Sequence, residues 1–88
     1  MGIYYYAIDK ATETIMEPPK EFNNRPPGIF QPRNPFPAMV MMRNCYGYNY
    51  EIINDMQSDY EECCSWKDVT QEVYEELLKI YPEWNDND

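Results

Sequence analysis

The sequence contains no histidine, and it has only three glycines and three cysteines among 88 residues. Without histidine, Ser-His-Asp and Cys-His catalysis are excluded, and zinc loses its commonest nitrogen ligand. The glycines form no phosphate-binding loop, because they lack the spacing that such loops require. Cys45, Cys63 and Cys64 are odd in number and show no Cys-x-x-Cys spacing, so we expect no disulfide framework, metal or cofactor. One of the adjacent cysteines should pack inward and the other should face solvent.

Long apolar runs are also missing. No stretch approaches the roughly 20 apolar residues that a membrane-spanning helix needs. The apolar run at residues 3–8 is too short for a secretory signal, and no basic residue precedes it. Together with the odd number of cysteines, these absences predict a cytoplasmic protein in a reducing compartment, with no membrane contact.

Positive charge is scarce and unevenly distributed. Seven Lys and Arg residues stand against sixteen Asp and Glu, which gives a formal net charge of −9. Residues 51–88 hold twelve of the acids and only Lys67 and Lys79 as bases. Proteins that bind nucleic acid or anionic membranes directly show the opposite bias, so we expect neither as a direct partner. A basic protein surface is the natural complement, although a solubilising role alone accounts for the same charge.

The apolar pattern predicts an α+β fold: a small antiparallel sheet of three to five strands, a C-terminal amphipathic helix packed on it, and a long proline-rich loop. β-branched and aromatic residues favour strands, and Gly47 suits a hairpin connection that needs positive φ. The expected strands are residues 3–8, 13–16, 38–42 and 48–53.

Two helices are predicted in the second half of the chain. Ser58 and Glu61 have the spacing of a capping box, which indicates a short helix over residues 59–65. Apolar residues then recur at helical spacing until Pro82 ends the pattern. The positions that define this C-terminal helix are Val69, Val73, Leu77 and Ile80, with Tyr74, Leu78 and Tyr81 beside them.

A chain of 88 residues has room for one domain, so we treat 1–88 as a single domain. Seven of the eight prolines lie within residues 17–38. Proline disfavours regular structure, while the interspersed Phe and Ile residues predict an ordered loop instead of a disordered linker. Residues 83–88 are expected to form a frayed acidic tail, unless Trp84 folds back onto the core.

The candidate partner-binding residues are two groups of carboxylates and three aromatic side chains. One acidic group belongs to the short helix, and the other lies one turn apart along the outer face of the C-terminal helix. Like charges at this spacing destabilise an isolated helix by a few tenths of a kcal/mol per pair, so their presence suggests a use. Tyr46 and Tyr48 would share a strand face. The full set is Asp59, Glu61, Glu62, Glu72, Glu75, Glu76, Tyr46, Tyr48 and Trp84.

These features predict a non-enzymatic, small acidic binding protein: a stoichiometric inhibitor that docks on a basic surface of a nucleic-acid-processing host protein by imitating nucleic acid. In size, acidity and lack of catalytic groups the chain resembles small phage-encoded DNA mimics and anti-restriction or anti-CRISPR inhibitors as a class. Two alternatives stay open: a small-ligand-binding or sequestering protein that uses the Tyr- and Phe-rich half, and a structural or assembly subunit. The wide apolar arc of the C-terminal helix also allows a homodimer.

Overall fold

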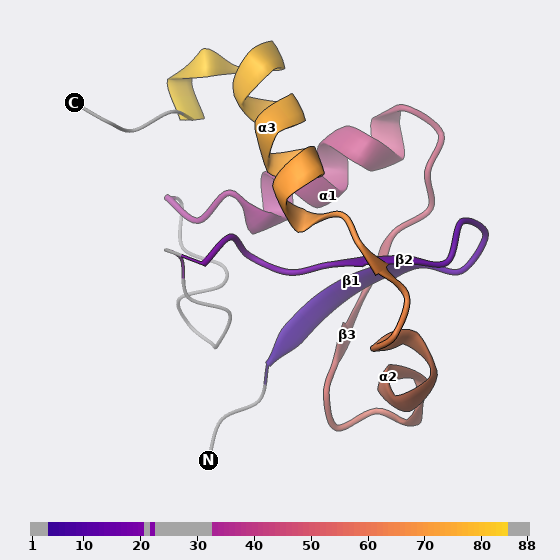
Figure 1. The fold of residues 1–88 in the computed structure, drawn as a ribbon. Coiled ribbons are helices and arrows are strands. Elements are labelled where there is room, and N and C mark those ends of the chain that lie inside the picture. The colour runs from indigo at the N-terminus through magenta and orange to yellow at the C-terminus, as the bar shows by residue number, and fades with distance from the viewer. Residues whose placement is uncertain (1–3, 21, 23–32, 85–88) are drawn as a thin grey trace.

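The computed structural model describes residues 4–20, 22 and 33–84. They form an α+β fold in which helices cover both faces of a four-stranded sheet (Figure 1), so the predicted fold class is confirmed. The elements in chain order are β1 (Tyr5–Asp9), β2 (Thr14–Met16), α1 (Phe36–Cys45), β3 (Glu51–Asn54), α2 (Ser58–Cys63), β4 (Lys67–Asp68), α3 (Thr70–Ile80) and the 3-10 turn η2 (Pro82–Trp84).

The sheet has the strand order β3-β1-β2-β4. β1 pairs antiparallel with both of its neighbours, so that Ala7 lies opposite Met16 in β2 and opposite Ile52 in β3. β4 runs parallel to β2, with Ile15 paired to Asp68. The sheet is therefore mixed, and the prediction of an antiparallel sheet is wrong at this edge. A parallel pair needs a long crossover, which the chain between β2 and β4 provides through α1, β3 and α2.

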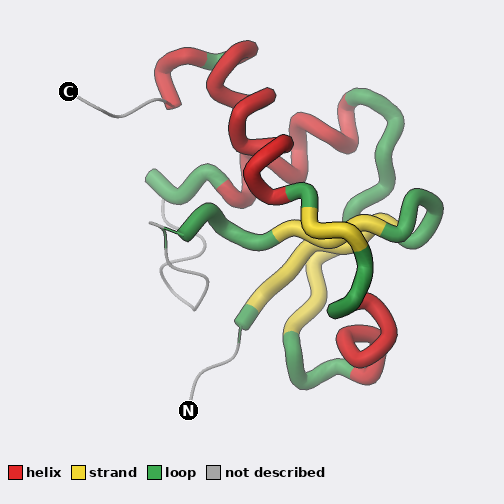
Figure 2. Tube along the Cα trace, in the orientation of Figure 1, coloured by secondary structure: helices red, strands yellow, loops and turns green. Residues whose placement is uncertain are grey.

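Alternation of side chains along the strands creates two apolar layers. Ala7 and Met16 face α1 and α3, whose buried side chains include Phe36. Ile8 belongs to the opposite layer, which buries one further side chain each from β2, β3 and α2. In Figure 2, α1 and α3 accordingly lie on one side of the sheet and α2 on the other.

Residues 38–42, predicted to be a strand, lie instead in helix α1. A run of Ala, Met and Val suits either structure, so periodicity alone does not decide it. The flanking prolines do favour a helix: Pro35 is the N-cap and Pro37 lies in the first turn, where proline's missing N–H costs no hydrogen bond. The side-chain oxygen of Asn34 accepts a hydrogen bond from the backbone N–H of Phe36 at 3.0 Å.

Gly47 ends α1 and does not close a hairpin. Its φ of 99° has the predicted positive sign. The N–H of Gly47 donates to the carbonyl of Asn44, and the N–H of Tyr48 donates to the carbonyl of Arg43. This pair of bonds is the Schellman motif, in which a glycine just after the helix satisfies carbonyls that lack partners inside the helix.

Other differences from the predictions are local. Half of the proline-rich loop at 17–38, residues 21 and 23–32, lies outside the described residues, and the last three residues of the loop belong to α1. Phe22, inside this segment, lies edge-on against Tyr74 of α3, with ring centroids 6.2 Å apart. The capping box is absent, because Gln57 is the N-cap of α2 and no side chain bonds to that cap. No helix among the described residues is long and apolar enough to span a bilayer.

The C-terminal helical segment packs differently from the expected helix lying across the sheet. α3 lies chiefly against α1, and both helices then cover the sheet. Trp84 folds back and packs against the same core from η2. The expected frayed tail is therefore not observed at residues 83–84, while residues 85–88 lie outside the described part of the chain.

Candidate functional site

The two predicted groups of carboxylates lie on opposite faces of the sheet. One group, the α2 acids, comprises Asp59, Glu61 and Glu62. The other, the α3 acids, comprises Glu72, Glu75 and Glu76. Helix α2 packs on the layer that contains Ile8, whereas α3 packs on the layer that contains Ala7. The six carboxylates therefore form two separate surfaces, each with its own electrostatic environment.

Arg43 neutralises part of the α3 acids, a pairing that the sequence did not predict. Its Nε donates to Oε1 of Glu76 at 2.9 Å, and its Nη2 lies 3.5 Å from Oε2 of Glu72. The Arg43 side chain is only 8% exposed, and its guanidinium lies 4.5 Å from the centroid of the Tyr48 ring. Burial lowers the pKa of Arg43, but the hydrogen bond and charge of Glu76 outweigh burial and raise it above its ordinary value.

The α3 acids also have a second cation beside them. Together with Arg43, Lys79 and Ile80 they line a hollow of about 570 Å³. Glu75 accepts a hydrogen bond from Gln71 at 3.1 Å. Three carboxylates thus face two cations, which leaves little unbalanced charge. The sequence signal for this pairing is the position of Arg43 in the last turn of a helix. That signal is absent when residues 38–42 are predicted to be a strand.

The α2 acids are less compensated. Nζ of Lys10 lies 3.6 Å from Oδ2 of Asp59, but both side chains are substantially exposed, so the pair contributes at most about 1 kcal/mol. Glu61 and Glu62 are exposed and form no salt bridge with any residue of the described chain. Cys63 anchors the helix beneath them, because its side chain is buried.

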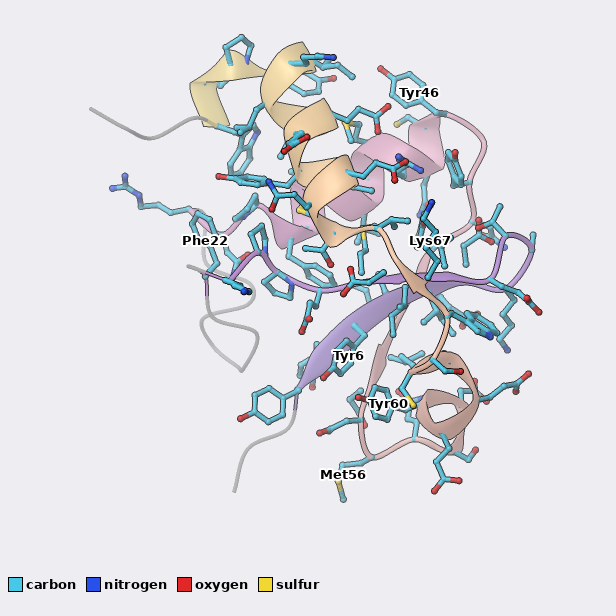
Figure 3. The ribbon with its side chains drawn as sticks, viewed as in Figure 1. Tyr6, Phe22, Tyr46, Met56, Tyr60 and Lys67 are labelled. Atoms are coloured by element: carbon cyan, nitrogen blue, oxygen red, sulfur yellow. The ribbon has the colours of Figure 1, made fainter. Side chains whose placement is uncertain are left out.

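A pair of stacked tyrosines also holds α2 against the sheet. Figure 3 shows Tyr60 of α2 beside Tyr6 of β1, and their ring centroids lie 4.9 Å apart. Burial, together with the hydrogen bond and charge of Tyr60, raises the pKa of Tyr6. The stacked rings therefore add an apolar contact that packs α2 on the sheet.

The three predicted aromatic residues are not grouped on a strand. Tyr46 and Tyr48 follow α1 in an irregular loop, and β3 begins only at Glu51, so the predicted shared strand face is wrong. Tyr46 is 57% exposed, and the half-buried Tyr48 ring lies 5.8 Å from the ring of Tyr50. Trp84 instead belongs to the core beside α1 and α3.

A polar network joins the β1–β2 turn to this loop. The carboxylate of Asp9, only 2% exposed, accepts hydrogen bonds from the backbone N–H of Ala11 at 3.0 Å and from Oγ1 of Thr12 at 3.1 Å. Thr12 bonds to Thr14 at 2.9 Å, and Thr14 bonds to the Tyr50 hydroxyl at 2.6 Å. The turn and the loop are therefore fixed relative to each other.

A hollow of about 300 Å³ lies between the same turn and loop. It is lined by Asp9, Ala11, Thr12 and residues 46–49. Sequence reasoning singled out the two tyrosines but missed Asp9. The signal available in the sequence was an aspartate at the start of a turn, three residues before a threonine.

The two adjacent cysteines differ in exposure. Cys63 is buried and Cys64 is exposed, as predicted, and burial raises the pKa of the Cys63 thiol. Among the described residues, no three His, Cys, Asp or Glu side chains are placed to hold a metal ion. No protein-family model matches the chain, no curated protein matches it, and no solved structure matches its fold.

Proposed function

We propose that this protein is a stoichiometric, inhibitor-like binding protein that docks through α2 on a basic surface of a nucleic-acid-processing protein. The supporting observation is the distribution of unbalanced charge. Glu61 and Glu62 are exposed on a helix that packs on the sheet through Cys63 and Tyr60, and no described cation pairs with them. Surfaces that bind nucleic acid are rich in Lys and Arg, so they are electrostatic complements of such a helix.

The α2 acids are better candidates for this contact than the α3 acids. A carboxylate that already pairs with a buried guanidinium would have to leave Arg43 uncompensated before it could bind a partner. Glu51 strengthens the α2 surface, because it is exposed and alternates onto the same sheet face as the buried Ile53. The surface that we propose for docking therefore consists of the α2 acids and Glu51.

The experiment compares affinity capture by the tagged protein with capture by a charge-reversed variant, Glu61→Lys with Glu62→Lys. Extracts are prepared at about 0.1 M and about 0.5 M salt, because screening lengths shorten from about 10 Å to a few ångströms over this range. We expect one stoichiometric partner that the protein retains at low salt and loses at high salt. Duplex DNA added at low salt should displace it, since both would occupy the same groove.

The matched control is Glu75→Lys with Glu83→Lys, which changes the net charge by the same amount on exposed residues of α3 and η2. If α2 is the docking surface, this control keeps the partner and the α2 variant loses it. Equal loss with both variants would mean that net charge alone drives capture. A partner that survives high salt and α2 reversal would exclude the acidic docking surface.

Glu72 and Glu76 are unsuitable for charge reversal. Both carboxylates contact the buried Arg43 guanidinium, so a lysine at either position would place like charges together in a partly buried site. Loss of binding in such a variant would not be distinguishable from loss of folding. Circular dichroism and urea unfolding of the Glu61 and Glu75 variants verify that both remain folded before capture is compared.

A further inference from the structure

The hollow between the β1–β2 turn and the loop after α1 combines a buried carboxylate with tyrosine rings. Asp9 lies at the end of β1 and alternates with Ala7, so its side chain points to the sheet face that carries α1. Tyr46 and Tyr48 line the hollow from the facing loop. Its volume of about 300 Å³ is at the lower end of the range for ligand pockets, enough for one side chain of a partner.

The walls of this hollow are held in place before any ligand arrives. On one side, the Schellman bonds from Gly47 and Tyr48 fix the loop to the end of α1. Asn44 reinforces the same loop: its side-chain amide donates to the carbonyl of Tyr50 at 3.1 Å and accepts from the N–H of Tyr50 at 2.8 Å. A ligand would therefore meet a preorganised site and would lose little affinity to ordering the loop.

The charge of Asp9 is not balanced within the described chain. Each carboxylate oxygen accepts one hydrogen bond, from Ala11 or from Thr12, and a carboxylate can accept about four in all. The nearby cations are engaged elsewhere, Lys10 with Asp59 and Arg43 with the α3 acids. No Lys or Arg among residues 4–20, 22 and 33–84 forms a salt bridge with Asp9.

We propose that this hollow binds the guanidinium group of an arginine side chain on the partner, with Asp9 as its counter-ion and Tyr46 as its aromatic wall. The proposal rests on the docking function proposed above and names one anchor of that contact. A guanidinium is planar, stacks on aromatic faces and matches a carboxylate with two parallel N–H donors. The chain already uses a tyrosine in this way, since the guanidinium of Arg43 lies over the Tyr48 ring.

The β1–β2 turn joins the hollow, on the face of the sheet that carries α1, to α2 on the opposite face. Lys10 follows Asp9 directly in the β1–β2 turn, and its ion pair with Asp59 links that turn to α2. Figure 1 shows the turn and α2 on the same side of the molecule. A basic surface that covers α2 and continues around this turn could therefore place one arginine in the hollow.

The test is an NMR titration of the isolated protein with Nα-acetyl-arginine amide, which needs no partner. A ligand of this size is expected to bind with a Kd on the order of 1 mM. Amide shifts should concentrate at Ala11, Thr12 and residues 46–49. The uncharged isostere Nα-acetyl-citrulline amide is the control, and we expect it to bind at least tenfold more weakly. Equal affinity for both compounds, or shifts centred on α2 or α3, would overturn the proposal.

Two variants test the named roles. Asp9→Asn removes the charge while keeping the shape, and should lower the affinity for arginine amide at least tenfold. Tyr46→Ala should weaken it about two- to fivefold, the loss of one exposed cation–π contact, whereas Tyr81→Ala, on a similarly exposed tyrosine outside the hollow, should not. If Asp9→Asn fails to fold, Tyr46→Ala against Tyr81→Ala decides, and equal affinity in that pair rejects the site.

The two proposals fail in different ways. Reversal of Glu61 and Glu62 should abolish capture of the partner but leave the titration with arginine amide essentially unchanged. A hollow that ignores arginine amide, in a protein whose capture depends on α2, would reject the arginine site alone. Arginine binding in a protein that captures no salt-sensitive partner would reject the docking function and leave the hollow as a site for cationic small molecules.

Discussion

Replacement of Glu76 by glutamine should destabilise the fold, although Glu76 is a partly exposed residue on an acidic helix. Its Oε1 accepts a hydrogen bond of 2.9 Å from the Arg43 side chain, which is 8% exposed. Glutamine keeps a similar shape and an acceptor oxygen, but it removes the negative charge. The guanidinium would then depend on Glu72, at 3.5 Å, and on the ring of Tyr48.

The expected magnitude follows from the hydrogen bond and the exposure of its two ends. Glutamine still accepts a hydrogen bond from the charged guanidinium and loses only the attraction between opposite charges, so Glu76→Gln should cost about 1 kcal/mol. Removing one partner of a fully buried pair costs about 3–5 kcal/mol. Because the Glu76 side chain is 36% exposed and solvent screens it, we expect Glu76→Ala to cost about 2 kcal/mol.

Urea unfolding monitored by circular dichroism measures these differences. A loss of 1 kcal/mol corresponds to a decrease in Tm of about 4–8 °C for a domain of this size. Glu72→Gln, at an exposed carboxylate with a longer contact, should cost no more than about 0.5 kcal/mol. Glu75→Gln removes a similar charge without touching Arg43, and it measures the effect of lowering net charge alone.

The order of the unfolding free energies of the three glutamine variants tests the role of Glu76. If Glu76→Gln and Glu75→Gln have equal unfolding free energies, Arg43 does not rely on Glu76, and its burial has another cause. If Glu72→Gln is the most destabilised of the three, Glu72 and not Glu76 makes the main contact with Arg43. Either conclusion requires unchanged urea m-values, because these show that each variant exposes the same amount of surface on unfolding.

Two further predictions concern Glu17 and Gly47. Burial, with a smaller contribution from Asp68, raises the pKa of the Glu17 carboxyl. Because the folded-state pKa is raised, the protonated carboxyl favours folding at acid pH, and this stabilisation is lost as the pH rises. Measured by urea unfolding, Glu17→Gln should therefore be more stable than the parent at about pH 7 and equally stable at about pH 3. Gly47→Ala should cost about 1 kcal/mol in the same assay, because a residue with a side chain is strained at a φ of 99°. The cost comes from the backbone and not from a clash, since no atom lies within 4 Å of the added Cβ. An equally stable alanine variant would mean that the Schellman turn tolerates a side chain.

The sequence predicts those elements whose structure depends on interactions between residues close together in the chain. The β-formers of residues 3–8 and the turn that follows correspond to β1 and its connection to β2. Apolar spacing points to a helix near the C-terminus, where α3 lies. The prediction of a strand at 38–42 is wrong because its apolar residues suit a strand and a buried helix equally. Pro37 fits a loop as well as the first turn of a helix, and Gly47 fits a hairpin as well as a helix end.

The composition and order of residues alone determined an acidic, histidine-free chain of α+β class whose carboxylates concentrate in its second half. Tertiary packing decided which of those carboxylates are free. Arg43 meets Glu76 across 33 positions only because α1 and α3 pack together, and Asp9 meets the Tyr46 loop only because the sheet and α1 bring two turns to one edge. Such contacts depend on how whole elements pack, which no local pattern of residues specifies.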